Sequence, residues 1–212
     1  RGARRSRPLP DGERVASCGD ASQVLVWNAR SGRLLVQINA SAWVRQLWVL
    51  EPGDLVLTWA DNAAFNVETG RNDFMVWNAS TGHALHPLEN GRRVLCLEVS
   101  PCGRKVVIAG MIVLSVYDGL TGTLDDRIVR PTPREHRLDR NRGSIVRLSR
   151  GAKRVFEHLA YSLITVWDLT IGSHRHWNID VGHPVVAFAV DDRGRRAFIF
   201  SHAADVVWDV DA

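Results

Sequence analysis

The sequence lacks a long hydrophobic run, and this excludes one class of protein at the outset. No stretch approaches the roughly 18 consecutive apolar residues that a membrane-spanning helix requires. The arginines of the first ten residues, RGARRSRPLP, are not followed by the apolar segment of a secretory signal. We therefore expect no membrane span and no signal peptide.

Cysteine and lysine are also scarce. The 212 residues include three cysteines, Cys18, Cys96 and Cys102, an odd number without metal-ligand spacing. This pattern predicts reduced thiols rather than a disulfide framework, and so a protein of the cytoplasm or the nucleus. Two lysines stand against 25 arginines, and the net charge is only +4. The composition is 45% hydrophobic and 24% charged, which is typical of a folded domain.

One short phrase recurs along the chain. It reads VWNARSG from residue 26, VWNASTG from 76, VYDGLTG from 116, VWDLTIG from 166 and VWDV from 207. The spacings between its aromatic residues are 50, 40, 50 and 41 residues, so the period is about 40 with two insertions of about ten. The five aromatic positions are Trp27, Trp77, Tyr117, Trp167 and Trp208.

A second phrase keeps step with the first, about fifteen to twenty residues before it in most periods. It is a polar turn followed by an apolar run, as in PDGERVAS from residue 10 and SPCGRKVVIAG from residue 100. Further short apolar runs flank both phrases, so each period supplies about four strands joined by turns. One such sheet cannot bury both of its faces, and copies must therefore pack against one another. The sequence predicts an all-β fold of four-stranded antiparallel blades, a β-propeller.

The two phrases, in register over residues 10–212, resemble those of the WD-repeat family of β-propellers. Trp167-Asp168 and Trp208-Asp209 carry the name-giving pair, and Gly182-His183 matches the family's Gly-His. The resemblance implies a buried set of side chains that hydrogen-bond to one another. In the first copy, Ser17, Asp20 and Trp27 are the best partial match to that set. The other copies are degenerate, which implies blades that are held mainly by apolar packing.

The two ends of the repeat array predict an incomplete ring. We expect residues 1–9 to form a basic N-terminal segment outside the blades, so that the first copy begins at its second strand, and the last copy to stop at its third strand. The chain is thus interpreted as part of a larger propeller.

No pattern of catalytic or metal-binding residues stands out. The glycines fall singly at repeat turns, without a phosphate-binding fingerprint. His174 and His176, His83 and His86, and the pair Asp125-Asp126 are each better explained as exposed strand or loop residues. Trp43, Trp48 and Trp59 are expected to lie in the core between blades. We predict neither an enzyme nor a cofactor nor a metal site.

An arginine-rich tract at 127–154 is the one local feature of the sequence that suggests a binding function beyond the repeat scaffold. It includes one of the insertions, and Pro131 and Pro133 predict an extended loop there. Guanidinium groups bind carboxylates and phosphates. The candidate contact residues are Arg130, Arg134, Arg137, Arg140 and Arg142. Two interpretations stay open: a solvated connection, or a site for an acidic partner.

The family resemblance implies a noncatalytic scaffold or sensor module that binds other proteins, and such arrays also form the sensor ends of large signalling ATPases of the NACHT type. The alternative is binding of nucleic acid or another polyanion through residues 127–154, although no aromatic residues interleave with the arginines. The sequence predicts a partner with an acidic surface and leaves the oligomeric state open.

Overall fold

Antiparallel strands joined by tight turns make up the architecture. The computed structural model describes residues 5–19, 22–51, 54–61, 73–89, 94–110, 112–130, 145–160, 162–170 and 175–211. Within these ranges every regular element is a strand, and no helix is long and apolar enough to cross a membrane.

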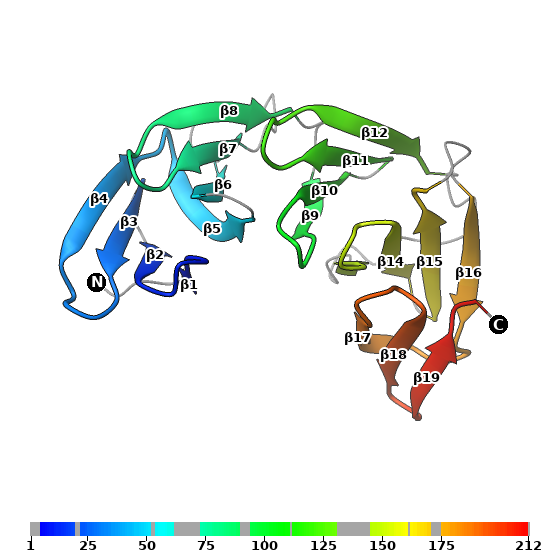
Figure 1. Cartoon of the computed structure of the whole chain (residues 1–212). Helices are drawn as coiled ribbons and strands as arrows, with labels where there is room; N and C mark the ends of the chain where they lie inside the picture. The colour runs from blue at the N-terminus through cyan, green and yellow to red at the C-terminus, as the bar shows by residue number, and fades with distance from the viewer. Residues whose placement is uncertain are drawn as a thin grey trace. The chain divides into compact units, whose positions relative to one another are not determined.

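The strands form five sheets in chain order (Figure 1). The first sheet contains β1 (Arg5–Pro8), β2 (Arg14–Cys18), β3 (Gln23–Asn28) and β4 (Leu34–Asn39). The second contains β5 (Trp43–Leu50), β6 (Leu55–Asp61), β7 (Asp73–Asn78) and β8 (Ala84–Leu88). The third contains β9 (Val94–Val99), β10 (Lys105–Gly110), β11 (Val113–Asp118) and β12 (Leu124–Val129). The fourth contains β13 (Ile145–Leu148), β14 (Arg154–Ala160), β15 (Leu163–Asp168) and β16 (His176–Asp180), and the fifth contains β17 (Val185–Val190), β18 (Arg196–Ser201) and β19 (Asp205–Asp209). This confirms the predicted fold class, repeated blades of the β-propeller type.

The N-terminal boundary differs from the prediction of a basic segment at 1–9. Arg5–Pro8 form β1, which pairs antiparallel with β2 from Arg5 opposite Cys18 to Pro8 opposite Val15. All four residues of β1 are exposed, so no apolar alternation marks this edge strand in the sequence. The first sheet is therefore complete, whereas the fifth has three strands within the described residues.

The recurrent phrase encodes the turn between the third and fourth strands. In the first sheet, Oδ1 of Asn28 accepts hydrogen bonds from the backbone N–H groups of Arg30 and Ser31, at 3.1 and 2.8 Å. The Gly32 N–H then donates to the Asn28 carbonyl at 2.9 Å, with Gly32 at φ +68°. Asn78 with Gly82 and Asp118 with Gly122 repeat the arrangement. The polar residue and the glycine are thus required by the turn itself.

In the first and second sheets, the tryptophan of the phrase has a hydroxyl partner on the second strand. The indole N–H of Trp27 donates to Ser17 Oγ at 2.9 Å, and that of Trp77 donates to Thr58 Oγ1 at the same distance. The Ser17–Trp27 contact confirms part of the predicted hydrogen-bonded set, and its third member, Asp20, lies outside the described residues.

Two compact units can be distinguished, Arg1–Val94 with Tyr117–Asp126, and Leu95–Val116 with Arg127–Ala212. In the first unit, one face of the first sheet, including Ala16 and Val26, packs against Val56 and Trp77 of the second sheet. In the second unit, Phe156 and Val166 of the fourth sheet meet Ala197 and Ile199 of the fifth. In both interfaces a sheet thus buries an apolar face against the sheet that follows it.

The insertion at 60–73 falls between β6 and β7, as predicted, and its residues 62–72, Phe65 among them, lie outside the described ranges. The prediction of a core position is wrong for Trp43, whose exposure is 69% because it begins the first strand of its sheet. Trp48 and Trp59 are half-buried.

Candidate functional site

The arginine-rich tract at 127–154 is not a single loop, because parts of it lie in strands. Its ends lie in β12, β13 and β14, and Arg134, Arg137, Arg140 and Arg142 lie outside the described residues. Arg130 differs from the expectation of an exposed contact residue, because only 4% of it is accessible. It follows β12 directly, and its side chain turns into the second unit.

Arg130 forms an ion pair with Glu157 of β14, and both side chains are buried. The guanidinium also donates to the carbonyl oxygen of Gly110. Glu157 lies opposite Thr165 in the register, two residues after Val155, which is opposite Trp167. Ser17 and Thr58 hold the same place relative to Trp27 and Trp77. The fourth sheet therefore has a carboxyl where the first and second have a hydroxyl.

This substitution changes the electrostatics of the core. Burial raises the pKa of Glu157 to about 7, although the Arg130 charge and the Trp167 N–H act to lower it. The Trp167 indole approaches the carboxyl without the hydrogen-bond geometry that Trp27 and Trp77 have. Burial also lowers the pKa of Arg130, against the opposing effect of Glu157. Because solvent does not reach these groups, the pair is a structural element rather than a site for a ligand.

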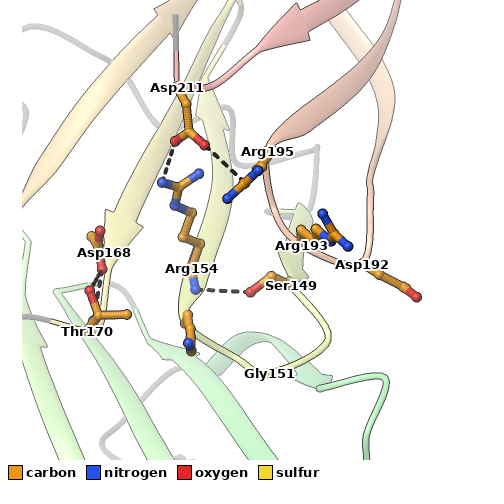
Figure 2. Close-up of a pocket in the computed structure, with 10 residues that line it drawn as sticks. Ser149, Gly151, Arg154, Asp168, Thr170, Asp192, Arg193, Arg195 and Asp211 are labelled. Atoms are coloured by element: carbon orange, nitrogen blue, oxygen red, sulfur yellow. Dashed lines mark hydrogen bonds and ion pairs between the residues drawn. The ribbon is translucent and has the colours of Figure 1, made fainter.

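A polar hollow of about 430 Å³ lies in the second unit, where turns of the fourth and fifth sheets meet. Figure 2 shows Asp168 and Thr170 on one side of it, and Asp192 and Arg193 on the other. The lining residues are Ser149, Gly151, Lys153, Arg154, Asp168, Thr170, Asp192, Arg193, Arg195 and Asp211.

The acidic side chains of this hollow already have partners. Asp211 accepts from Arg154 at 2.5 Å and lies 3.5 Å from Arg195 (Figure 2). Asp192 lies 3.2 Å from Arg150. Burial of Asp168 opposes its ionisation, but hydrogen bonds from Thr170 outweigh burial and lower the pKa. Asp192 and Asp211 are therefore held in ion pairs, and Asp168 is held as a carboxylate by hydrogen bonds.

Two cations of the hollow are not engaged in this way. Lys153 and Arg193 are exposed, and neither makes an ion pair or a side-chain hydrogen bond to another described residue. Four cationic side chains and three carboxylates line the hollow, so it carries an excess of positive charge. Such a site suits an incoming carboxylate or phosphate.

The hollow has no arrangement for nucleophilic catalysis among its described residues. No His, Cys or Tyr lines it, and the hydroxyl of Ser149 accepts the backbone N–H of Arg154 at 3.1 Å. Within the described ranges no group of three or more His, Cys, Asp or Glu side chains is placed to hold a metal ion.

The histidines singled out in the sequence lie apart from the hollow. His86 Nε2 lies 2.9 Å from the carbonyl oxygen of Leu120, and burial lowers its pKa. His176 packs against the ring of Trp167, with centroids 4.7 Å apart, and His174 lies outside the described residues.

The structure belongs to the class of repeated antiparallel blades of the β-propeller type. In a comparison with solved structures, 1291 chains match this chain. One of them is hydrazine synthase from Kuenenia stuttgartiensis, with a TM-score of 0.64 and 15% sequence identity over 97% of this chain. The present chain spans 64% of the length of that chain. At this identity the likeness is one of fold. No family model and no curated protein matches the sequence.

Sequence reasoning missed Lys153 and Arg193 as a pair, because 40 residues separate them. The signal was nevertheless present: both stand in the second phrase of their copies, SRGAKR and DDRGRR, and equivalent turns of neighbouring sheets lie side by side.

Proposed function

We propose that this chain is a noncatalytic protein-interaction module of the WD-repeat kind, which binds an acidic segment of a partner protein in the hollow of the second unit. The observation that carries the proposal is the unequal pairing of charges there. Every lining carboxylate has a partner, whereas Lys153 and Arg193 present cationic groups to solvent. A rigid sheet scaffold that displays such groups on turns is suited to recognition.

The Trp–hydroxyl contacts of the first and second sheets support the family assignment. Cys18, Cys96 and Cys102 form no disulfide, which fits a reducing compartment, and we place the module in the cytoplasm.

Nucleic-acid or polyanion binding through the tract at 127–154 is the less favoured function. Among the described cations of this tract, Arg130, Arg147, Arg150 and Arg154 have acidic partners within the fold. Lys153 has no such partner, but it lines the hollow of the proposed peptide site.

The test is binding of a fluorescent glutamate-rich peptide, measured by anisotropy. The double variant Lys153→Glu with Arg193→Glu should weaken binding by about tenfold or more, since each change replaces an attraction by a repulsion. Arg33→Glu with Arg104→Glu is the matched control, because both residues are exposed and the net charge changes equally. Equal weakening in both variants would show that only net charge matters and would reject the site.

A labelled single-stranded oligonucleotide serves as the second probe. Tighter binding of the oligonucleotide than of the peptide, with a steep loss of affinity on adding salt, would favour the polyanion function instead.

A further inference from the structure

The hollow of the second unit has a counterpart in the first unit, between the first and second sheets. Arg14 begins β2 and lies opposite Asn28, and Arg154 begins β14 and lies opposite Asp168. The two arginines thus hold equivalent positions in their sheets. A comparison of the two places shows which charges of the hollow the contact between sheets requires.

This contact uses one arginine in both units. The guanidinium of Arg14 lies 2.9 Å from Asp54 Oδ1, and that of Arg154 lies 2.5 Å from Asp211 Oδ1. The Arg154 guanidinium also lies over the ring of Trp177, with its central carbon 5.6 Å from the ring centroid. Arg154 is therefore held in place by the fold and belongs to the packing of the sheets.

Two neighbouring positions carry opposite charges in the two units. The residue directly before β2 is Glu13, whereas the residue directly before β14 is Lys153. The residue directly before β6 is Asp54, whereas Arg195 is the residue directly before β18. In the second unit Asp211 receives the arginine in place of Asp54.

The first unit forms the same contact with carboxylates at both positions. Cations at these positions are therefore not a requirement of the repeat, and the positive charges of Lys153 and Arg195 serve something other than the packing of the sheets.

Three cationic side chains of the hollow can reach a ligand. Lys153 and Arg193 are exposed and make no ion pair with another described residue. Arg195 is 63% exposed and lies 3.5 Å from Asp211, which already has the closer contact with Arg154 (Figure 2). Because its own contact is long and open to solvent, Arg195 can turn to an incoming anion at little cost.

The charge around the hollow favours a phosphate over a single carboxylate. The segments that border it, 149–154, 168–175, 191–196 and 209–211, contain seven arginine and lysine residues against five aspartates. A phosphorylated side chain carries a charge of about −1.5 to −2 at pH 7, which matches this excess, whereas one glutamate supplies half of it. The phosphate also has three terminal oxygens, so three cations can bind it together.

We propose that the partner segment bound in this hollow carries a phosphorylated side chain, with its phosphate held by Lys153, Arg193 and Arg195. This inference rests on the proposed function, since it names the acidic group that the same hollow recognises. Phosphorylation of the partner then controls the association.

The experiment compares three fluorescent peptides of one acidic sequence, with serine, glutamate or phosphoserine at the central position, by anisotropy with the whole chain. We expect the phosphoserine peptide to bind about tenfold more tightly than the glutamate peptide, and the serine peptide to bind most weakly.

The variant Lys153→Glu with Arg195→Asp introduces the residues that the first unit has at the equivalent positions. It should remove the preference for phosphoserine. Arg33→Glu with Arg104→Asp changes the net charge equally at exposed positions and should retain the preference. Lys153→Gln is a milder change at an exposed position and should reduce the preference to about threefold. Circular dichroism checks that each variant is folded.

The outcomes separate this inference from the proposed function. Binding of the glutamate peptide without a gain from phosphoserine overturns the inference and leaves the proposed function standing, whereas no binding of any peptide rejects both. A preference that survives in Lys153→Glu with Arg195→Asp places the phosphate elsewhere and overturns the inference. So does displacement of the phosphopeptide by an equal concentration of inorganic phosphate, which would indicate a site for the free ion.

Discussion

At the scale of single residues, the turn of the recurrent phrase depends on a left-handed glycine. Gly32, Gly82 and Gly122 have φ between +68° and +76°, but their surroundings differ. A methyl group on Gly32 would meet open space, whereas on Gly122 it would come within 2.8 Å of the His86 imidazole. Gly32 is therefore required only by its backbone conformation, whereas Gly122 is also required by the space that the His86 side chain occupies.

Gly32→Ala should lower the free energy of unfolding by about 1 kcal/mol, the cost of a left-handed alanine. Gly122→Ala should cost about 1 to 3 kcal/mol more, because the new methyl group also displaces the imidazole. Urea unfolding of the two variants measures the difference. Equal losses would mean that the His86 contact imposes no constraint.

Glu157 gives stability a dependence on pH. Its pKa is raised from 4.5 to about 7 in the folded chain, chiefly by burial. Between these values the folded state keeps a proton that the unfolded state has lost, so stability should fall as pH rises from about 4.5 to about 7 and stay level above. Urea unfolding at several pH values in this window checks the slope.

Glu157→Gln should abolish this fall, since an amide does not titrate. Glu98→Gln removes a partly exposed carboxyl of the same unit, paired to Arg147 at 3.7 Å, and should retain the fall. A wild-type slope in Glu157→Gln would assign the titration to another group.

At the scale of elements, the fourth sheet places a different group beside its tryptophan than the first and second sheets do. A hydroxyl of Ser17 or Thr58 satisfies one indole N–H and adds no charge. Glu157 in the same place brings a carboxyl into the core and needs Arg130 as its counter-ion. Desolvation of two charges offsets much of their attraction, so the pair fixes the path of the chain after β12 more than it stabilises the sheet.

A double-mutant cycle tests this account. Arg130→Met or Glu157→Thr alone should destabilise the chain by about 3 to 5 kcal/mol, because each leaves one buried group without its partner. The two together should restore most of the loss, since the threonine can accept the Trp167 N–H as Thr58 accepts that of Trp77. Additive losses in thermal or urea unfolding would contradict it.

At the scale of the whole molecule, stability is distributed over nearest-neighbour interfaces rather than one central core. The first unit has its own apolar cluster around Ala16, Val26 and Val56, and the second has clusters around Val107 and around Phe156. Repeat arrays of this kind respond to damage locally.

Ile164→Ala removes a fully buried side chain from the cluster of the fourth and fifth sheets and should cost about 2 to 5 kcal/mol. We expect faster amide hydrogen exchange in β14, β15 and β18, and unchanged exchange in β2, β3 and β6 of the first unit. Equal acceleration throughout would show that the chain unfolds as a single cooperative body.

The sequence by itself determined the period, the blade fold and the turns, because these depend on residues close together in the chain. The spacing of Trp27, Trp77, Tyr117 and Trp167 marks the third strands, and Asn28 with Gly32 forms a turn by local hydrogen bonds. Strand β1 could not be predicted from the sequence, because its four residues are all exposed and show no alternation of apolar and polar side chains.

Tertiary structure alone decided which charged residues face solvent. Arg130 and Lys153 belong to one arginine-rich tract, yet one is buried against Glu157 and the other lines the hollow. Composition cannot separate them, because burial and pairing depend on side chains supplied by other strands and other sheets. The exposed Phe198 and Val207 differ from the buried Phe156 and Val166 for the same reason: a strand's own residues fix which face is apolar, and only the neighbouring sheet determines whether that face is covered.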